Sequence, residues 1–274
     1  MNLLITGASG FIGRNLCEFF IDKNINFIAL VRETTNIDFF KEKKIKYFVF
    51  DGKIQKLSSF IIEKKITGVV HLSTYFVSSH NENDILPLIN SNILFSLSIL
   101  EACKNSNIKW FINTGTFWQH YKGYEYNPVN LYAATKQSFE ALMKYYDEVT
   151  NIKFTTLKIN DTYGDGDTRK KIFHLWKENL KSKSLLKMSP GNQLIDIVHV
   201  DKVVKAFFKL INILEREKNI HNSYFISSGE KITLKDLAKK FENTHGLKLN
   251  IEWGALPYRE REVMKPACKG KELK

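Results

Sequence analysis

Short runs of apolar residues, mostly β-branched or aromatic, recur along the first 160 residues and are separated by segments with helical spacing. The runs predict strands at Leu3–Thr6, Phe27–Val31, Tyr47–Phe50, Gly68–Leu72, Trp110–Asn113 and Phe154–Ile159. The clearest helical segment has apolar residues spaced by four, four and three on one predicted face, namely Ile89, Ile93, Leu97 and Leu100. Nearly continuous apolar strands that alternate with helices predict an α/β fold with a doubly wound parallel sheet.

The pattern becomes irregular after about residue 160. Gly164-Asp165-Gly166-Asp167 is followed by a basic stretch from Arg169 to Lys187. A strand pattern at Asp196–Val200, a helix at Asp201–Leu214 and a strand at Ser223–Ser227 come next. We therefore expect residues 161–191 and 228–274 to form a smaller C-terminal lobe, interleaved with residues 192–227, which return to the main sheet.

Length and composition exclude several classes of protein. The chain has 274 residues, and its 43% hydrophobic share is enough for a core, which excludes a wholly disordered chain. Its three cysteines, Cys17, Cys103 and Cys268, form no C-x-x-C pair, which excludes a secreted disulfide scaffold and favours a cytoplasmic location. No apolar run approaches the ~18 residues of a membrane helix, and the first strand leaves no room for a signal peptide.

The formal net charge of +12 is compatible with nucleic acid, an anionic membrane or anionic small molecules as partners. The sequence has no basic stripe with base-stacking aromatic residues, so we expect neither a nucleic-acid nor a membrane partner. The spacing of histidines and cysteines favours no metal site, and no nucleophile elbow supports a hydrolase.

Three glycines with G-x-x-G-x-x-G spacing follow the first strand and open a helix. The first permits a tight turn, the second lets the backbone approach a pyrophosphate, and the third lets the helix pack close to the strand. The helix N-terminus offers free N–H groups to the phosphates. Residues 1–160 are therefore predicted to be a Rossmann-type dinucleotide-binding domain, with cofactor contacts from Gly7, Ser9, Gly10, Phe11, Ile12 and Gly13.

The end of the second strand distinguishes between the two nicotinamide cofactors. An acidic residue there would bind the ribose of NAD, whereas this chain has Arg32, whose guanidinium suits the 2′-phosphate of NADP. Thr34 adds a hydroxyl donor. The alternative is a surface arginine that pairs with Glu33. We expect NADP(H) as the cofactor.

Tyr132 and Lys136 lie four residues apart, on one face of a predicted helix. A free tyrosine titrates near pH 10, and a nearby ammonium group lowers its pKa. We therefore expect Tyr132 to act as a proton donor with Lys136 as its partner. A hydroxyl at the end of the preceding strand, Ile112–Thr116, would hold the substrate carbonyl.

The glycine loop and the Tyr132-x-x-x-Lys136 pair resemble the extended short-chain dehydrogenase/reductase family, in its nucleotide-sugar branch. Further matching segments are Val70-His71-Leu72-Ser73, Asn92 and Asp196–Asp201. Three more segments are similar to the CDP-paratose/CDP-abequose synthase type, NADPH-dependent reductases of nucleotide-linked 4-keto deoxysugars: Asn113–Tyr121, Asn127–Tyr132 and Pro257–Glu262.

The resemblance implies a role for each matching residue. The catalytic residues would be Thr114, Tyr132 and Lys136, and additional cofactor contacts would come from Asp51, Leu72, Ser73 and Asn92. Substrate contacts would come from Thr74, Thr116, Phe117, Trp118, Asp161, Arg169 and Arg259. Dehydratases of this branch carry an Asp-Glu pair after the catalytic Thr, and Gly115-Thr116 stand there instead, which argues against a dehydratase.

We therefore expect an oxidoreductase of deoxysugar and polysaccharide biosynthesis, which reduces the C4 keto group of a nucleotide-diphosphate 4-keto-6-deoxy or 3,6-dideoxy sugar. CDP and TDP are the favoured nucleotides, and a homodimer stays open. Arg169 and Arg259 are expected at the diphosphate, because arginine binds phosphate oxygens in bidentate fashion. Two alternatives are an NAD-dependent nucleotide-sugar 4-epimerase and a non-catalytic NADP-sensing protein.

Overall fold

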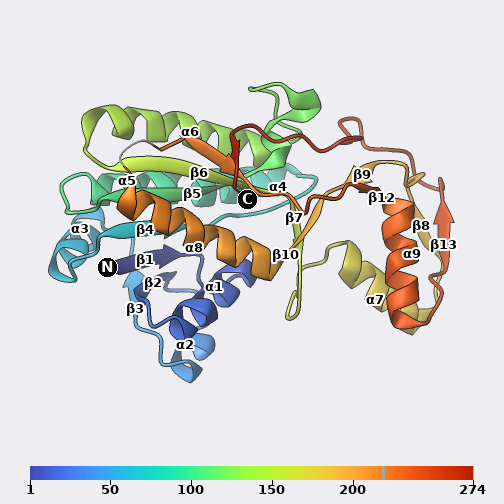
Figure 1. The fold of residues 1–274 in the computed structure, drawn as a ribbon, viewed down its shortest axis with the longest axis horizontal. Helices are drawn as coiled ribbons and strands as arrows, with labels where there is room; N and C mark the ends of the chain where they lie inside the picture. The colour runs from blue at the N-terminus through green and yellow to red at the C-terminus, as the bar shows by residue number, and fades with distance from the viewer. Residues whose placement is uncertain (218–219, 274) are drawn as a thin grey trace.

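A computed structural model describes residues 1–217 and 220–273 of the chain. Across these residues the centre is an eight-stranded parallel sheet in the order β14-β11-β6-β5-β4-β1-β2-β3 (Figure 1). Its strands are β1 (Asn2–Thr6), β2 (Asn26–Arg32), β3 (Tyr47–Phe50), β4 (Gly68–His71), β5 (Trp110–Thr116), β6 (Lys153–Ile159), β11 (Ser223–Phe225) and β14 (Lys271–Glu272). The doubly wound parallel sheet predicted from the apolar runs is confirmed.

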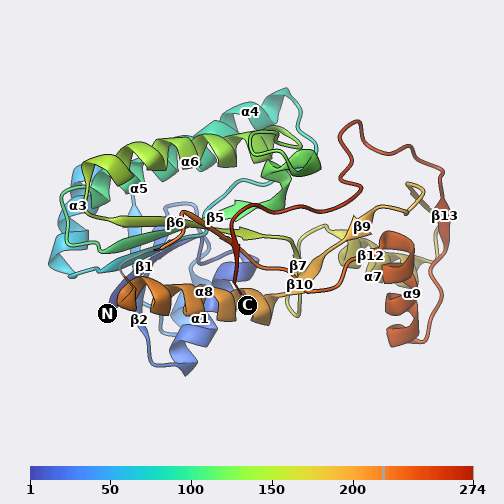
Figure 2. The same ribbon diagram turned by 45° about the horizontal axis from the view of Figure 1, so that its top comes forward.

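Helices cover both faces of this sheet (Figure 2). One face carries α3 (Ile54–Glu63), α4 (Glu82–Ile89), the π-helical turn η1 (Asn90–Leu94), α5 (Phe95–Cys103) and α6 (Leu131–Val149). The other carries α1 (Phe11–Asp22), α2 (Asp38–Glu42) and α8 (Val200–Arg216). Each face has its own apolar cluster, and the neighbouring β5 residues Trp110 and Phe111 point into different ones. Burial on both faces explains why the strands are apolar throughout.

The predicted apolar face matches the buried face of the helix at Ile93, Leu97 and Leu100 and differs from it at Ile89. Ile89 is 43% exposed, whereas Leu88 and the polar residues Asn92 and Ser96 are buried. The cause is the π-helical turn, which inserts wider backbone spacing between α4 and α5 and rotates the buried stripe. Apolar spacing alone could not identify the buried polar residues Asn92 and Ser96.

No uninterrupted apolar run of about 18 residues was expected, but one helix among the described residues is long and apolar enough, by length and composition only, to cross a membrane. Glu82–Cys103 form one helical run of 22 residues with a mean hydropathy of 1.5 in its most apolar window. Its second half nevertheless packs in the core through Ile99, Leu100 and Cys103. Within this fold the run is therefore part of the helical layer over the sheet.

A smaller lobe lies beside the carboxyl ends of the strands, at the right of Figures 1 and 2. Its core packs α7 (Ile172–Ser182) against α9 (Leu234–His245) through Trp176 and Phe241. Three short strand pairs complete it: β7 (Asp161–Tyr163) with β10 (Ile197–His199), β8 (Leu186–Met188) with β13 (Ile251–Trp253), and β9 (Leu194–Ile195) with β12 (Ile232–Thr233).

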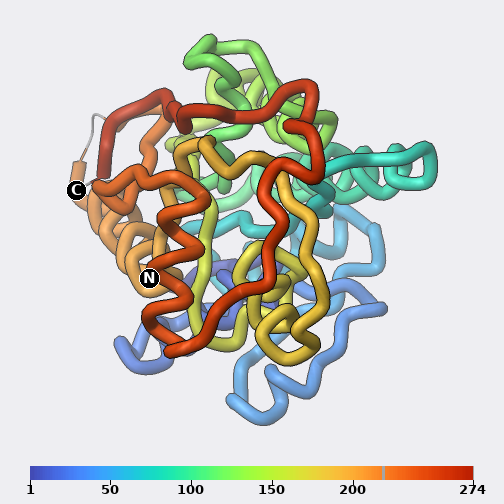
Figure 3. Tube along the Cα trace, turned by 90° about the vertical axis from the view of Figure 1, so that its right-hand side faces the viewer, coloured from blue at the N-terminus to red at the C-terminus, as the bar shows by residue number. Residues whose placement is uncertain are grey.

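The segment after β13 runs around the outside of the small lobe and returns to the main sheet as β14 (Figure 3). The amide of Leu273 donates to the carbonyl of Phe225 over 2.8 Å, and the Leu273 side chain is buried. Gly270 has φ +120°, and a Cβ there would lie 2.5 Å from the carbonyl oxygen of Ser223, so this crossing requires glycine. A two-residue edge strand is too short to show a period, which is why its return was not predicted.

Candidate active site

A cleft of about 1220 Å³ opens at the carboxyl ends of the central strands, between the sheet and the start of the small lobe. Ligands of doubly wound sheets bind at this edge because the loops after the strands diverge there. Thr114 and Thr116 reach the cleft from β5, and Asp161 and Arg169 reach it from the small lobe. The cleft is therefore bounded by both parts of the molecule.

The glycine turn forms one wall of the cleft. Gly7 has φ +69°, and a Cβ there would lie 2.6 Å from the amide nitrogen of Ser73, while one at Gly13 would lie 2.2 Å from the carbonyl oxygen of Gly7. Helix α1 begins after Gly10 with neither a side-chain cap nor an acidic residue in its first turn. Its first N–H groups thus lack a side-chain acceptor at the cleft, which fits the pyrophosphate of a dinucleotide.

The end of β2 forms the far wall. Arg32 is exposed, lines the cleft and has no ion pair with Glu33 in the described part of the chain. Thr34 lines the cleft beside it. Asp51 lies close by, where a hydrogen bond from the Lys53 amide and a 3.2 Å ion pair with Lys56 hold the pKa of its carboxyl below the usual range.

Tyr132 and Lys136 project from the first two turns of α6 into the cleft. Asn130 caps this helix, because its side-chain oxygen accepts a 3.0 Å hydrogen bond from the Ala133 amide. Tyr132 and Lys136 are 9% and 3% exposed and both line the cleft. Thr114 lines it from β5 and donates a 2.9 Å hydrogen bond to the His71 carbonyl. The structure thus brings the three predicted catalytic residues to one cleft.

The ionisation of this pair differs from the expectation that Lys136 lowers the pKa of Tyr132. Burial raises the pKa of Tyr132 to about 12, against the opposing effects of a hydrogen bond with Thr74 and the charge of Arg169. Burial also lowers the pKa of Lys136 to about 8, while the Glu140 carboxylate acts to raise it. Burial is the largest cause of both pKa shifts, so the phenol of Tyr132 is protonated at neutral pH.

Aromatic residues surround the Tyr132 ring. Phe76 meets it edge-to-face at 4.9 Å, and Trp118 lies 6.5 Å away. Lys171 stands over the Phe76 ring at 5.3 Å and forms a 3.3 Å ion pair with Asp161. Phe76 and Lys171 both line the cleft, and sequence reasoning missed them. Phe76 carried no motif, and Lys171 was one of many basic residues, so only proximity to Tyr132 identifies them.

Two residues with predicted contacts, Asn92 and Arg259, lie outside the lining of the cleft. Asn92 does not line the cleft; its side chain accepts hydrogen bonds from the Tyr75 amide at 2.7 Å and the Thr74 hydroxyl at 3.0 Å, and donates to Thr135 at 2.9 Å. It therefore holds Thr74 in place from behind. Arg259 is exposed outside the cleft, because the chain after β13 passes around the small lobe.

Arg169 reaches the cleft but is already bonded within the protein. Its Nε and Nη2 donate to the two carboxylate oxygens of Asp167, each over 2.7 Å, and Nη2 also donates to the Thr162 carbonyl. Its guanidinium also stacks on Phe11. The guanidinium of Arg169 thus makes its bidentate contact with Asp167, where a contact with a diphosphate was expected.

The remaining predicted residues line the cleft. Besides those described above they are Ser9, Ile12, Leu72, Ser73 and Phe117. Further lining comes from polar residues without a motif, including Tyr75, Asn90, Ser91 and Asn160. In the described part of the chain, no three His, Cys, Asp or Glu side chains are grouped to hold a metal ion.

The sequence model of a protein family described as the NAD dependent epimerase/dehydratase family matches residues 3–223. This chain belongs to that family. The glycine turn and the Tyr132–Lys136 pair both lie within the matched segment.

Among curated proteins the chain is similar to two CDP-abequose synthases. The one from Salmonella typhimurium is 27% identical over 99% of this chain and 91% of the relative. The one from Yersinia pseudotuberculosis is 26% identical over 100% of this chain and 94% of the relative. The resemblance to the extended short-chain dehydrogenase/reductase family, and to this synthase type, is confirmed.

Two solved structures share the fold. UDP-glucuronic acid 4-epimerase from Bacillus cereus, in complex with UDP-glucuronic acid and NAD, has a TM-score of 0.83 at 21% identity and covers 98% of this chain and 90% of the epimerase. UDP-glucose 4-epimerase from Thermus thermophilus, in complex with NAD, has a TM-score of 0.81 at 19% identity with the same coverage. With the family membership, these findings confirm the Rossmann-type fold and an NAD(P)-dependent enzyme of oxidoreductase type.

Proposed function

We propose that this enzyme reduces the C4 keto group of a nucleotide-diphosphate 4-keto-6-deoxy or 3,6-dideoxy sugar with NADPH. The observation that carries the proposal is the meeting of Tyr132, Lys136 and Thr114 at one cleft whose far wall presents Arg32. The full-length similarity to CDP-abequose synthases supports a keto-sugar substrate linked to CDP, with TDP as the second choice.

The cofactor site supports a phosphorylated dinucleotide. The uncapped start of α1 would hold the pyrophosphate, and Arg32 with Thr34 would hold a ribose 2′-phosphate. Asp51 would contact the adenine amino group, since its ionised carboxylate is an acceptor. When bound, NADPH supplies the hydride for the C4 keto carbon.

The reaction requires a proton for the oxygen that becomes the C4 hydroxyl. Tyr132 is the proposed donor, because burial keeps its phenol protonated at neutral pH. Lys136, one turn further along α6, would stabilise the resulting phenolate. Thr114 would orient the C4 oxygen after turning its hydroxyl from the His71 carbonyl. Leu72, Ser73 and the backbone beside them close the cofactor side of this space.

The sugar is proposed to lie against the aromatic wall. Phe117 and Trp118 present apolar surface, and Thr74, Thr116 and Asp161 present hydrogen-bonding groups to ring hydroxyls. Lys171 is our candidate cation for the nucleotide diphosphate, since its partner Asp161 neutralises it only in part at a partly exposed site.

A 4-epimerase is the second candidate, favoured by the similarity of the fold to UDP-sugar 4-epimerases with NAD. An epimerase uses the same Tyr-Lys pair but returns the hydride to the sugar. Arg32 disfavours this alternative, because NAD has no 2′-phosphate for it to bind.

The deciding experiment mixes the full chain with CDP- and TDP-linked 4-keto-6-deoxy sugars and follows the absorbance of NADPH. Stoichiometric loss of NADPH together with a C4-reduced sugar supports the reductase. Interconversion of the C4 epimers of a CDP- or TDP-linked 4-hydroxy sugar, supplied in a parallel reaction with NAD, and no loss of NADPH with the 4-keto sugars, would instead establish the epimerase. Thermal shifts with CDP, TDP, UDP and GDP identify the nucleotide, because a ligand of the folded state raises its stability.

We also propose that a second copy of the chain covers the apolar surface of α4 and η1, where Ile85, Leu86 and Leu94 are 48%, 66% and 57% exposed. A Leu86→Glu variant should then sediment as a monomer while the parent sediments as a dimer. A monomeric parent would exclude the dimer.

We propose a cytoplasmic location for the enzyme, because its three cysteines are unpaired and free thiols are typical of a reducing compartment.

A further inference from the structure

We propose that Glu140 is a positioning residue of this site, which balances the charge of Lys136 and ties α6 to the turn that carries Thr116. The inference rests on the proposed function, in which Lys136 and Thr116 act on the reacting pair and the sugar. No motif singled out Glu140, and it does not line the cleft.

Glu140 stands one helical turn after Lys136 and two turns after Tyr132 on α6. Side chains four residues apart on a helix are neighbours, so the carboxylate is placed to act on the Lys136 ammonium. The buried imidazole of His71 on β4 also faces Lys136, and burial together with the charge of Lys136 holds the pKa of His71 well below its ordinary value. Glu140 is therefore the negative charge that acts on this buried lysine.

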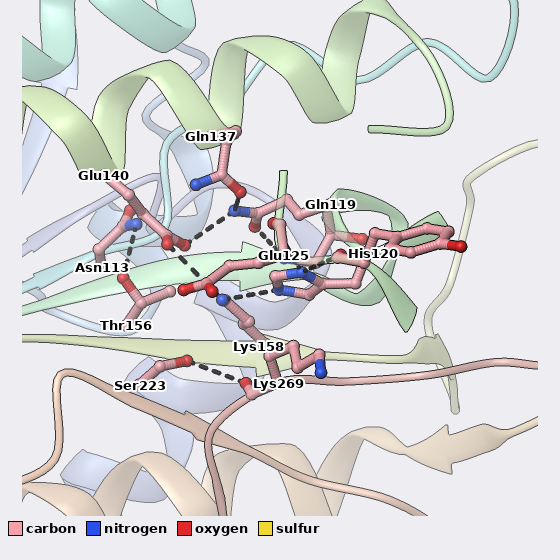
Figure 4. A network of polar contacts seen from close by, with 12 residues as sticks. Asn113, Gln119, His120, Glu125, Gln137, Glu140, Thr156, Lys158, Ser223 and Lys269 are labelled. Atoms are coloured by element: carbon pink, nitrogen blue, oxygen red, sulfur yellow. Dashed lines mark hydrogen bonds and ion pairs between the residues drawn. The ribbon is translucent and has the colours of Figure 1, made fainter. Parts of the chain in front are cut away.

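Glu140 also serves a second buried lysine. Lys158 on β6 has a side chain 5% exposed, and its Nζ lies 3.6 Å from Glu140 Oε2 (Figure 4). Its other partner, His120, is neutral: Nδ1 donates to the carbonyls of Tyr124 and Glu125, and Nε2 accepts from Lys158 over 2.8 Å. Burial and Lys158 lower the pKa of His120 to about 4. One carboxylate thus balances two buried ammonium groups.

The other oxygen of Glu140 fixes a loop. Oε1 accepts a 2.9 Å hydrogen bond from Gln119 Nε2 (Figure 4). In turn, Gln119 Oε1 accepts a 2.9 Å hydrogen bond from the Thr116 amide. A Cβ on Gly115 would lie 2.8 Å from that Gln119 oxygen, so glycine leaves room for the contact. Gln137 Oε1 on α6 accepts from the same Gln119 nitrogen over 3.1 Å. Glu140 and Gln137 thus link the catalytic helix to the substrate-contacting turn, where Thr116 and Gln119 are buried.

The charge part is tested by competitive acetylation of Lys136 in the full chain without cofactor, from pH 6 to 11, with the peptide quantified by mass spectrometry. Glu140→Gln keeps the shape and the acceptor for Gln119 but removes the charge, so the labelling midpoint should fall by about one pH unit, a tenfold change in the protonated fraction. Glu140→Asp, which keeps the negative charge, should restore the labelling midpoint of the parent chain. Glu101→Gln, which removes the carboxylate bonded to Tyr146 further along α6, should leave it unchanged.

The proposed link between α6 and the turn that carries Thr116 is tested by hydrogen exchange of the backbone amides from Thr116 to Gln119. Glu140→Leu, which cannot accept a hydrogen bond, should speed exchange at the Thr116 amide about tenfold, and Glu140→Gln should not. A Lys136 midpoint unchanged in Glu140→Gln, or exchange unchanged in Glu140→Leu, would overturn the inference. If Glu140→Leu does not fold, the labelling result decides. Labelling as expected with no reduction of any keto sugar would instead overturn the proposed function alone.

Discussion

The guanidinium of Arg169 lies over the ring of Phe11, with 4.4 Å between its central carbon and the ring centroid. Arg169 belongs to the loop between β7 and α7, and Phe11 begins α1 directly after the glycine turn. Asp167 holds the guanidinium over the ring through two 2.7 Å hydrogen bonds. The small lobe therefore contacts the cofactor turn at this point, and Arg169 acts on that turn through Phe11.

Arg169→Lys should weaken NADPH binding about tenfold, because lysine cannot pair with Asp167 in bidentate fashion and is no longer held over Phe11, where a partly exposed cation–π contact is worth about 1 kcal/mol. Titration calorimetry measures the change, and Arg216→Lys on α8, remote from the cleft, is the matched control. An unchanged Kd for NADPH together with weaker substrate binding would instead indicate that Arg169 binds the diphosphate of the substrate.

Tyr132→Phe should keep the fold and lower kcat by about 10²–10⁴, because it removes only the proposed proton donor. Tyr146→Phe makes the same chemical change on the same helix, where the hydroxyl donates to Glu101 over 2.7 Å, and should retain activity. Steady-state rates with the keto sugar decide between them. Full turnover by Tyr132→Phe would show that another group supplies the proton.

Arg32→Ala should reduce the preference for NADPH over NADH by about 10- to 100-fold, since a hydrogen bond to a charged group is worth about 1.5–3 kcal/mol. The measurement is kcat/KM with each cofactor. The rate with NADH should stay near that of the parent, because NADH lacks the 2′-phosphate. An equal loss with both cofactors would contradict the assignment.

Lys136→Met should inactivate the enzyme yet stabilise it at pH 7. The folded-state pKa of Lys136 is lowered from its ordinary value of 10.5 to about 8, so below pH 8 the folded chain carries a buried charge that opposes folding. Removing the charge should raise the free energy of unfolding by on the order of 3 kcal/mol. Urea unfolding should show this gain shrinking between about pH 8 and 10.5. A gain that is constant with pH would indicate improved packing instead.

Leu273→Ala should destabilise the chain by about 3 kcal/mol, because it opens a cavity in the core where β14 closes the sheet. Leu256→Ala, at a side chain 48% exposed in the same C-terminal segment, should cost less than about 0.5 kcal/mol. Urea unfolding measures both. Equal effects would mean that the end of the chain does not contribute to the core.

Much of the fold and the centre of the site could be predicted from local pattern. The parallel strands are buried on both faces, so each appears as an apolar run, and the glycine turn and the Tyr132–Lys136 pair depend on spacings within one strand-turn-helix unit or one helix. Arg32 could also be predicted from local sequence, because it stands at the end of a strand that its apolar run identifies.

Only the tertiary structure decided which groups from distant segments meet. Asn92 and Arg259 matched motifs, yet one is saturated by internal hydrogen bonds and the other lies outside the cleft. Phe76 and Glu140 matched none, yet one packs on Tyr132 and the other acts on Lys136. The pKa of Tyr132 likewise moved opposite to the expected direction, because desolvation depends on everything packed around a side chain. Sequence spacing specifies neighbours within one element, whereas burial and contacts between elements arise only when the chain is folded.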